Sequence, residues 1–189
     1  MMKMINEVKF RRRREGVTNY AKRLALVKSG LERVVVRKTN KRVLGQVVKY
    51  EEKGDKVVAS AESGELARKF GWPSRSNRST AYLTGLLLAK KAKTKGELIL
   101  DIGITTPIKS SVSFAFAKGC VDGGMKLKGS FEIKEEMYNA SLTAKYAEQL
   151  KAKPEQLKKQ FGGYIAANAQ PETLPKLFNE VKEKILKSG

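Results

Sequence analysis

The sequence contains no histidine and a single cysteine, Cys120. Without histidine, the chain lacks the usual general base near neutral pH and every Ser-His or Cys-His nucleophile arrangement. One cysteine cannot form an internal disulfide, which indicates a reducing compartment, and it excludes zinc fingers and zinc ribbons. We therefore expect neither a common catalytic mechanism nor a bound metal or cofactor.

Long hydrophobic runs are absent as well. No apolar stretch approaches the roughly 20 residues that a membrane-spanning helix needs. The basic residues near the N-terminus are not followed by an apolar segment with a small-residue cleavage site, so the sequence shows no secretory signal. We expect a cytoplasmic protein without a membrane partner.

Acidic residues are scarce relative to basic ones. The chain has 19 Asp and Glu against 39 Lys and Arg, a formal net charge of +20, and its 41% hydrophobic content is enough for a sizeable core. Because self-repulsion opposes compaction, such an excess makes most sense if a polyanion supplies the missing charge. Residues 1–49 alone hold 15 basic and 3 acidic side chains. We predict a nucleic-acid-binding protein whose contacts concentrate in this first quarter.

The residue pattern predicts an α/β fold with a mixed sheet. Three strand-like runs joined by turn-like segments indicate an antiparallel meander over residues 33–38, 43–50 and 56–60. The nearly continuous apolar run from Leu98 to Ile104 is typical of a strand buried on both faces. Helices are expected over residues 18–30, 63–70, 79–93 and 111–122. A meander followed by a strand between two helices indicates an α/β sandwich.

The chain divides into three predicted segments. Residues 1–16 show no amphipathic period, so we expect a basic arm that orders only on a partner. Residues 17–130 make the α/β core domain, whose first helix has Thr18 as its expected N-cap. Residues 131–189 make a helical C-terminal extension of nearly balanced charge. Its helices are expected over residues 140–151, 154–168 and 171–187.

The run from Arg11 to Arg14, close behind Lys9, is the strongest single signal for function. Arginine presents a planar fork of donors that binds phosphate through two hydrogen bonds and stacks on unpaired bases. Each neutralised phosphate also releases counterions, so the affinity of such an arm falls steeply with salt. The alternative is a solvated tail or a localisation signal. We predict RNA contact.

The stretch from Arg37 to Arg42 is a second basic cluster, placed on a predicted hairpin. Lysine and arginine on a hairpin edge follow a nucleic-acid backbone, and Asn40 is suited to reading a base edge. A polar turn kept soluble by its charge is the alternative.

The segment from Gly71 to Arg78 places Trp72 beside Arg75 and Arg78. An indole ring and guanidinium groups in one loop are suited to stacking on a looped-out base. Equally, Trp72 could plug the edge of the core. The sequence leaves both interpretations open.

Asp101 is the best candidate for an enzymatic role, because an Asp on a central strand resembles a metal-binding carboxylate of some nucleases. Two-metal chemistry needs several converging carboxylates, however, and the other two aspartates are Asp55, in a predicted turn, and Asp122, at a predicted helix end. We expect Asp101 to bond loop backbone at a strand end. A metal-dependent nuclease and an RNA chaperone without a fixed target are the rival functions.

Several motifs, in order along the chain, resemble the archaeal and eukaryotic form of the 5S-rRNA-binding large-subunit ribosomal protein, the eighteenth protein of that subunit in bacterial counting. These motifs are Phe10–Gly16, Asn19-Tyr20, Arg33–Lys41, Gly71-Trp72, Ala81–Gly85, Leu100–Gly103, Thr106-Pro107 and Lys158–Ile165. The resemblance covers nearly the whole chain.

The resemblance implies a ribonuclease-H-like core without catalysis. It also implies binding of 5S rRNA, contact with large-subunit rRNA, and assembly with neighbouring ribosomal proteins in the central protuberance, without a homo-oligomer. The family's arm, helix start and hairpin, together with the loop after Gly71, define the predicted RNA-binding residues. They are Lys9, Arg11, Arg12, Arg13, Arg14, Asn19, Tyr20, Arg23, Arg37, Lys38, Asn40, Lys41, Trp72, Arg75 and Arg78.

Overall fold

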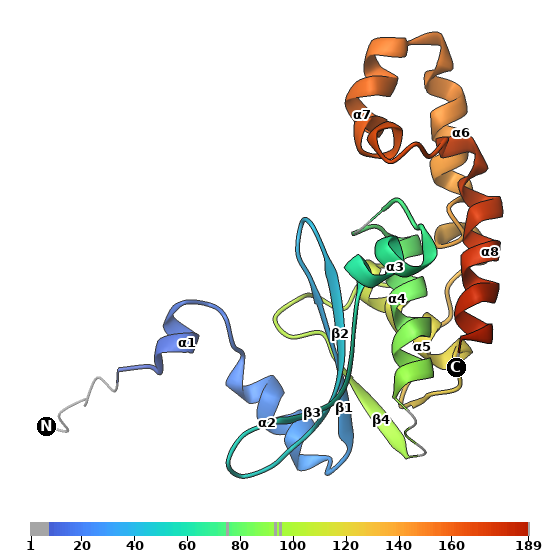
Figure 1. The fold of residues 1–189 in the computed structure, drawn as a ribbon. Helices are drawn as coiled ribbons and strands as arrows, with labels where there is room; N and C mark the ends of the chain where they lie inside the picture. The colour runs from blue at the N-terminus through green and yellow to red at the C-terminus, as the bar shows by residue number, and fades with distance from the viewer. Residues whose placement is uncertain (1–7, 75, 93, 95, 189) are drawn as a thin grey trace, which may run out of the picture.

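A computed structural model describes residues 8–74, 76–92, 94 and 96–188 (Figure 1). The N-terminal part has helices α1 (Arg11–Arg14) and α2 (Tyr20–Lys28), strands β1 (Glu32–Lys38), β2 (Val43–Lys49) and β3 (Lys56–Glu62), and helices α3 (Ser63–Phe70) and α4 (Arg78–Lys91). It continues with β4 (Glu97–Asp101), α5 (Val112–Asp122), β5 (Lys126–Leu127), α6 (Ser141–Gln149), α7 (Pro154–Ala166) and α8 (Leu174–Lys187). Short 3-10 turns cover Glu135–Met137, Leu150–Ala152 and Pro171–Thr173.

The five strands form one mixed sheet in the order β3-β2-β1-β4-β5. β1, β2 and β3 pair antiparallel, which confirms the predicted meander. β4 joins β1 in parallel, and the two-residue β5 pairs parallel to β4. Parallel neighbours need a crossover, and α3 and α4 supply it between the meander and β4. The predicted α/β class with a mixed sheet and flanking helices is therefore confirmed.

The two faces of the sheet differ in what covers them. Val34 and Val36 of β1 are buried against the layer formed by α4 and α5. The alternate residues Arg33, Val35 and Arg37 project from the opposite face, because successive side chains of a strand point to opposite sides. On that face lies α2, a helix with no buried residue (Figure 1). One face of the sheet thus builds the core, and the other remains largely open.

Helices α4 and α5 pack at close range through two glycines. Gly85 of α4 lies against the backbone of Phe116, and Gly119 of α5 lies against the backbone of Tyr82. A Cβ atom at either glycine would overlap a carbonyl oxygen of the other helix. Together with the sheet, α3 and α8, α5 buries α4 on almost every side, over Ser79–Leu88.

The C-terminal helices form in the predicted places. α8 packs on the main core through Leu174, Phe178, Val181 and Ile185, which recur at helical spacing. α6 and α7 instead share a small cluster around Ala147, Leu150 and Phe161. The predicted boundary at residue 131, between the core domain and the C-terminal extension, stays a prediction. α8 packs into the same core as the sheet.

Several local predictions were wrong in detail. The side chain of Asn19, not that of Thr18, caps α2 by accepting a hydrogen bond from the Lys22 backbone N–H at 3.1 Å. β4 ends at Asp101, and Ile104 is 59% exposed, because Gly103 turns the chain at a φ of 66°. Val121, expected in the core, lies at the exposed end of α5. The arm expected over residues 1–16 stays a prediction; its described part contains one helical turn, Arg11–Arg14, with no buried residue.

No helix among the described residues combines the length and the apolar character needed to cross a membrane.

Candidate nucleic-acid interface

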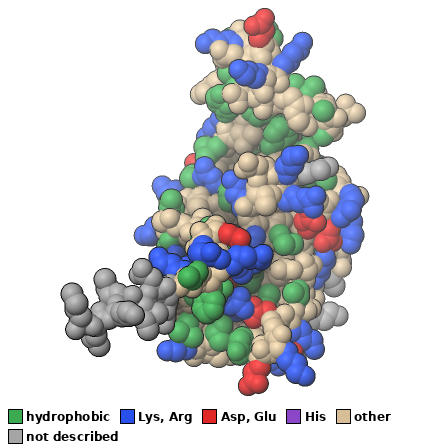
Figure 2. Space-filling view, turned by 90° about the vertical axis from the view of Figure 1, so that its left-hand side faces the viewer, with side chains coloured by type: hydrophobic (Ala, Val, Ile, Leu, Met, Phe, Trp, Pro, Cys, Tyr) green, Lys and Arg blue, Asp and Glu red, His purple; other side chains and the backbone are tan. Residues whose placement is uncertain are grey.

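A basic groove opens where the segment from Arg12 to Leu26 faces the carboxyl ends of β1 and β4. Its volume is about 520 Å³. Five predicted RNA-binding residues line it: Arg12, Asn19, Arg23, Arg37 and Lys38. The other lining residues are Gly16, Val17, Thr18, Lys22, Leu26, Thr39 and Asp101–Thr105. On the side of the molecule shown in Figure 2, Lys and Arg side chains gather beside exposed hydrophobic ones. The groove therefore offers both cationic and apolar contacts.

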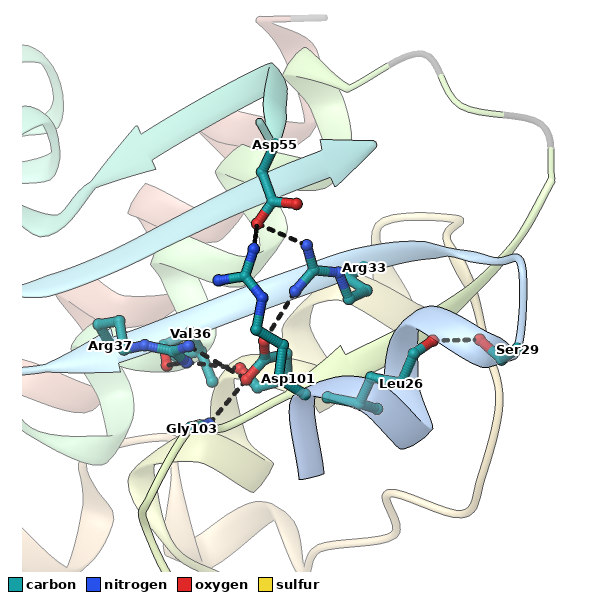
Figure 3. A network of polar contacts seen from close by, with 9 residues as sticks. Leu26, Ser29, Arg33, Val36, Arg37, Asp55, Asp101 and Gly103 are labelled. Atoms are coloured by element: carbon teal, nitrogen blue, oxygen red, sulfur yellow. Dashed lines mark hydrogen bonds and ion pairs between the residues drawn. The ribbon is translucent and has the colours of Figure 1, made fainter. Parts of the chain in front are cut away.

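An alternating chain of charges runs beneath the groove (Figure 3). Arg23 of α2 donates to Asp55 Oδ2 at 2.9 Å, and Arg33 Nη2 lies 2.7 Å from the same oxygen. Arg33 Nη1 lies 3.4 Å from Asp101 Oδ2, and Arg37 donates to Asp101 Oδ1 at 3.1 Å. We call these five residues, Arg23, Asp55, Arg33, Asp101 and Arg37, the arginine–aspartate chain. It connects α2, the β2–β3 turn, β1 and β4.

Burial makes the centre of this chain costly to disturb. The side chain of Arg33 is 3% exposed and that of Asp101 is 8% exposed. A charge that loses its partner inside a protein costs several kcal/mol, on the order of 3–5. The two aspartates flanking Arg33 therefore offset its buried charge and stabilise the fold, although they lower the positive charge of the surface above them.

Asp101 occupies the predicted strand-end position and bonds loop backbone, as expected. Its Oδ1 accepts a hydrogen bond from the Gly103 N–H at 2.8 Å. Its remaining contacts are the two arginines, so its oxygens face cationic groups of the protein. Among the described residues, no group of three or more His, Cys, Asp or Glu side chains could hold a metal ion.

Arg37 is held by the protein on one side and open on the other. Its Nη1 donates to the carbonyl oxygens of Val36 and Asp101, both at 2.8 Å, and its Nη2 donates to Asp101. Three of its five N–H donors are thus used, while 44% of the side chain stays exposed in the groove. A Cβ at Gly103 would lie 3.0 Å from the guanidinium carbon, so a larger residue there would push the guanidinium group aside by a few tenths of an ångström.

The arm and the start of α2 form the other wall of the groove. Arg12 Nε donates to Thr18 Oγ1 at 2.9 Å, which holds that arginine toward the groove. Asn19 uses its side-chain oxygen to cap α2, so its amide N–H groups remain for a ligand. Tyr20 is 37% exposed and its ring lies 5.4 Å from that of Phe10. Lys9, Arg11, Arg13 and Arg14 are exposed nearby.

The β1–β2 hairpin places Lys38 on the groove and the remaining predicted residues at its tip. Thr39 Oγ1 accepts from the N–H groups of Lys41 and Arg42, which shapes the turn. The Asn40 carbonyl accepts from Ser76 Oγ at 2.9 Å, which ties the tip to the loop before α4. The side chains of Asn40 and Lys41 are exposed.

The prediction that Trp72 stacks on a base is corrected by its burial. The side chain is 0% exposed, and its indole N–H donates to Thr80 Oγ1 at 2.8 Å. Its ring also packs edge-on against Phe178 of α8, with centroids 6.0 Å apart. Trp72 therefore belongs to the core, the alternative that the sequence had left open. Arg75 lies outside the described residues, and Arg78 begins α4 beside Met137, away from the groove.

Replacing Trp72 by Phe is expected to lower the free energy of unfolding by about 1–2 kcal/mol, because Thr80 loses the indole donor and a gap opens beside Phe178. Urea unfolding followed by circular dichroism measures this loss. The preference of the folded variant for one RNA over another should not change. A selective loss of binding to one RNA would instead indicate that Trp72 contacts RNA directly.

The sequence did not identify Lys22 as a groove residue, nor Arg33 and Asp55 as members of the arginine–aspartate chain. Arg33 and Arg37 lie four residues apart on one strand, and this even spacing places both on the same face. That spacing was an available signal. The sequence carried no such signal for Asp55, because this turn residue approaches Arg23 of α2 and Arg33 of β1 only in the folded protein.

The chain is similar to known proteins of the large ribosomal subunit. Residues 6–99 match the family model of ribosomal large subunit proteins 60S L5 and 50S L18. The chain is 43% identical over 187 residues to large ribosomal subunit protein uL18 of Sulfurisphaera tokodaii, covering 96% of this chain and 95% of that protein. It is 44% identical over 188 residues to uL18 of Saccharolobus solfataricus, with 97% and 94% covered. Similarity over almost the full length confirms the resemblance, and the chain belongs to the uL18 family of large-subunit ribosomal proteins.

Proposed function

We propose that this protein binds 5S rRNA and helps to attach it to large-subunit rRNA in the central protuberance. The observation that carries the proposal is the basic groove, because it brings together five predicted contact residues from the arm, α2 and the hairpin. Family membership makes the chain a ribonucleoprotein component of the large ribosomal subunit, located in the ribosome and hence in the cytoplasm. It also implies a structural rather than an enzymatic role.

Binding combines charge neutralisation with recognition of RNA shape. The exposed arginines of α1 neutralise phosphates, and the groove holds the backbone between Arg12 on one wall and Arg37 and Lys38 on the other. Tyr20 and the apolar residues Val17 and Ile104 beside these cations accommodate an unpaired base. Selectivity then comes from a few contacts at fixed positions rather than from the total charge.

The C-terminal helices supply contacts with neighbouring ribosomal proteins. Leu142 and Tyr146 of α6 and Ile165 of α7 are 42–46% exposed, although each is a large hydrophobic side chain. These residues lie away from the basic groove, on the part of the chain with nearly balanced charge. We expect no homo-oligomer.

A titration of labelled 5S rRNA with excess tRNA as competitor, at two salt concentrations, tests the proposal. Binding that survives both the competitor and moderate salt supports recognition of one RNA. Displacement of 5S rRNA by tRNA at parity would leave a general RNA chaperone. In the same samples, Mg²⁺ or Mn²⁺ should produce no RNA cleavage, and cleavage lost in Asp101→Asn would favour a nuclease.

Asn40→Ala is expected to reduce the preference for 5S rRNA over tRNA by about 1 kcal/mol, because the exposed amide at the hairpin tip is suited to a base edge. The substitution leaves the Asn40 carbonyl and its bond from Ser76 in place. The ratio of the two dissociation constants measures the effect. An equal loss on both RNAs would assign Asn40 to backbone contact.

A further inference from the structure

One carboxylate, Asp101, lines the groove that we assign to RNA, and a second, Asp55, pairs with Arg23 of the groove wall. Asp55 and Asp101 face arginines, and the charge of each would repel a phosphate placed above it. Simple electrostatics therefore predicts that both aspartates weaken RNA binding. We propose the opposite: Asp55 and Asp101 are positioning residues that strengthen RNA binding by holding Arg23 and Arg37 at the groove. This inference rests on the proposed function.

Asp55 acts through the placement of α2. This helix buries none of its residues, and it is joined to β1 by three residues, Ser29, Gly30 and Leu31. Among the described residues, the Arg23–Asp55 pair is the one side-chain hydrogen bond or ion pair that connects α2 to the sheet. The pair therefore sets where Asn19 and Lys22, at the start of α2, stand along the groove wall.

Arg33 makes Asp55 and Asp101 parts of one unit. It lies between them with a 3% exposed side chain, too deeply placed to meet RNA itself. Each aspartate forms an ion pair with Arg33 and with a second arginine, so Arg23 and Arg37 are linked across the sheet, although Arg33 Nη2 itself makes no hydrogen bond. Both remain partly exposed, at 46% and 44% of the side chain.

Holding long side chains before RNA arrives raises affinity. An arginine that is free in solution loses rotamer freedom when it binds a phosphate, and that loss subtracts from the binding free energy. Arg37 has lost this freedom already through its bonds to Val36 and Asp101. Arg23 has lost part of it through Asp55. The groove thus meets RNA with two guanidinium groups already in place.

The test compares Asp55→Asn with Glu52→Gln. Glu52 is exposed in the same β2–β3 turn, so each variant removes one negative charge from this turn. Electrostatics alone predicts slightly tighter 5S rRNA binding for both. Positioning predicts that Asp55→Asn binds roughly three- to tenfold more weakly than wild type, while Glu52→Gln does not weaken. Equal affinity of the two variants would overturn the proposal.

A double-mutant cycle separates positioning from a general loss of structure. Arg23→Ala should weaken RNA binding in the wild-type background and weaken it by a smaller factor beside Asp55→Asn, because Arg23 is no longer held at the groove in that background. Additive losses would contradict the proposal. Thermal melting verifies that each variant is folded.

If Asp55→Asn does not fold, Asp55→Glu replaces it, with Glu52→Asp as its control. The net charge is then unchanged, yet the longer side chain displaces Arg23. We expect Asp55→Glu, but not Glu52→Asp, to bind 5S rRNA more weakly than the wild type. Equal affinity of these two variants would again overturn the proposal. A wild-type protein without preference for 5S rRNA would refute the proposed function separately, because each comparison of variants is made on a single RNA.

Discussion

Gly85→Ala is expected to lower the free energy of unfolding by about 3 kcal/mol, although alanine favours a helix over glycine by about 1 kcal/mol. The added Cβ would overlap the carbonyl oxygen of Phe116, and Gly119 meets the carbonyl of Tyr82 in the same way. Backbone atoms cannot rotate aside as side-chain ends do. The two helices must separate, and the core that they share with the sheet loosens.

Gly162→Ala is the matched control for this prediction. Gly162 lies within α7, and a Cβ there would meet no atom within 4 Å. The same substitution should stabilise the protein by about 0.5–1 kcal/mol, through helix propensity and a less flexible unfolded chain. Opposite signs for the two variants are the expected result.

Cys120 provides a second measurement of the same prediction. It is the single cysteine, it lies on α5 in the α4–α5 contact region, and its side chain is fully buried. Burial raises the pKa of its thiol well above the usual range, so the folded protein should resist thiol reagents. Gly85→Ala should accelerate labelling together with the loss of stability in urea. An unchanged labelling rate and an unchanged unfolding midpoint would show that the helices accommodate the methyl group.

Replacing all four arginines of α1 by glutamine is expected to weaken 5S rRNA binding about 100-fold at low salt and to flatten the slope of log affinity against log salt by about 3–4. The four side chains are exposed. The pair from Arg11 to Glu15 is long, at 3.7 Å, with both side chains more than half exposed, so it adds little to stability. The variant should therefore fold normally and lose phosphate contacts.

A variant with equal charge loss elsewhere provides the control. Lys145, Lys153, Lys158 and Lys159 are exposed on α6, α7 and the segment between them, and none of them takes part in an ion pair among the described residues. Changing these four to glutamine lowers the net charge by the same amount. We expect a much smaller loss of affinity for 5S rRNA and a nearly unchanged salt slope. Equal effects of the two variants would mean that total charge, rather than the arm, determines binding.

Most of the secondary structure followed from local patterns. The meander, the helices over 63–70 and 111–122, and the three C-terminal helices were predicted close to their observed bounds. The two-residue β5 was missed, since so short a strand has no period of its own. Local patterns did not determine the burial of Trp72, because a tryptophan in a polar loop is compatible with either the core or the surface. The distant Phe178 on α8 and the Thr80 hydroxyl decide for the core.

The sequence by itself determined the partner class and the fold class, because net charge, absent residue types and apolar periodicity are properties of the chain before it folds. Only the tertiary structure decided which side chains meet. Arg33 reaches Asp101 across 68 residues of sequence, and Arg23 reaches Asp55 across 32. No local spacing encodes such contacts. They arise when β4 pairs in parallel with β1 and the β2–β3 turn meets α2, and that assembly turns scattered charges into one groove.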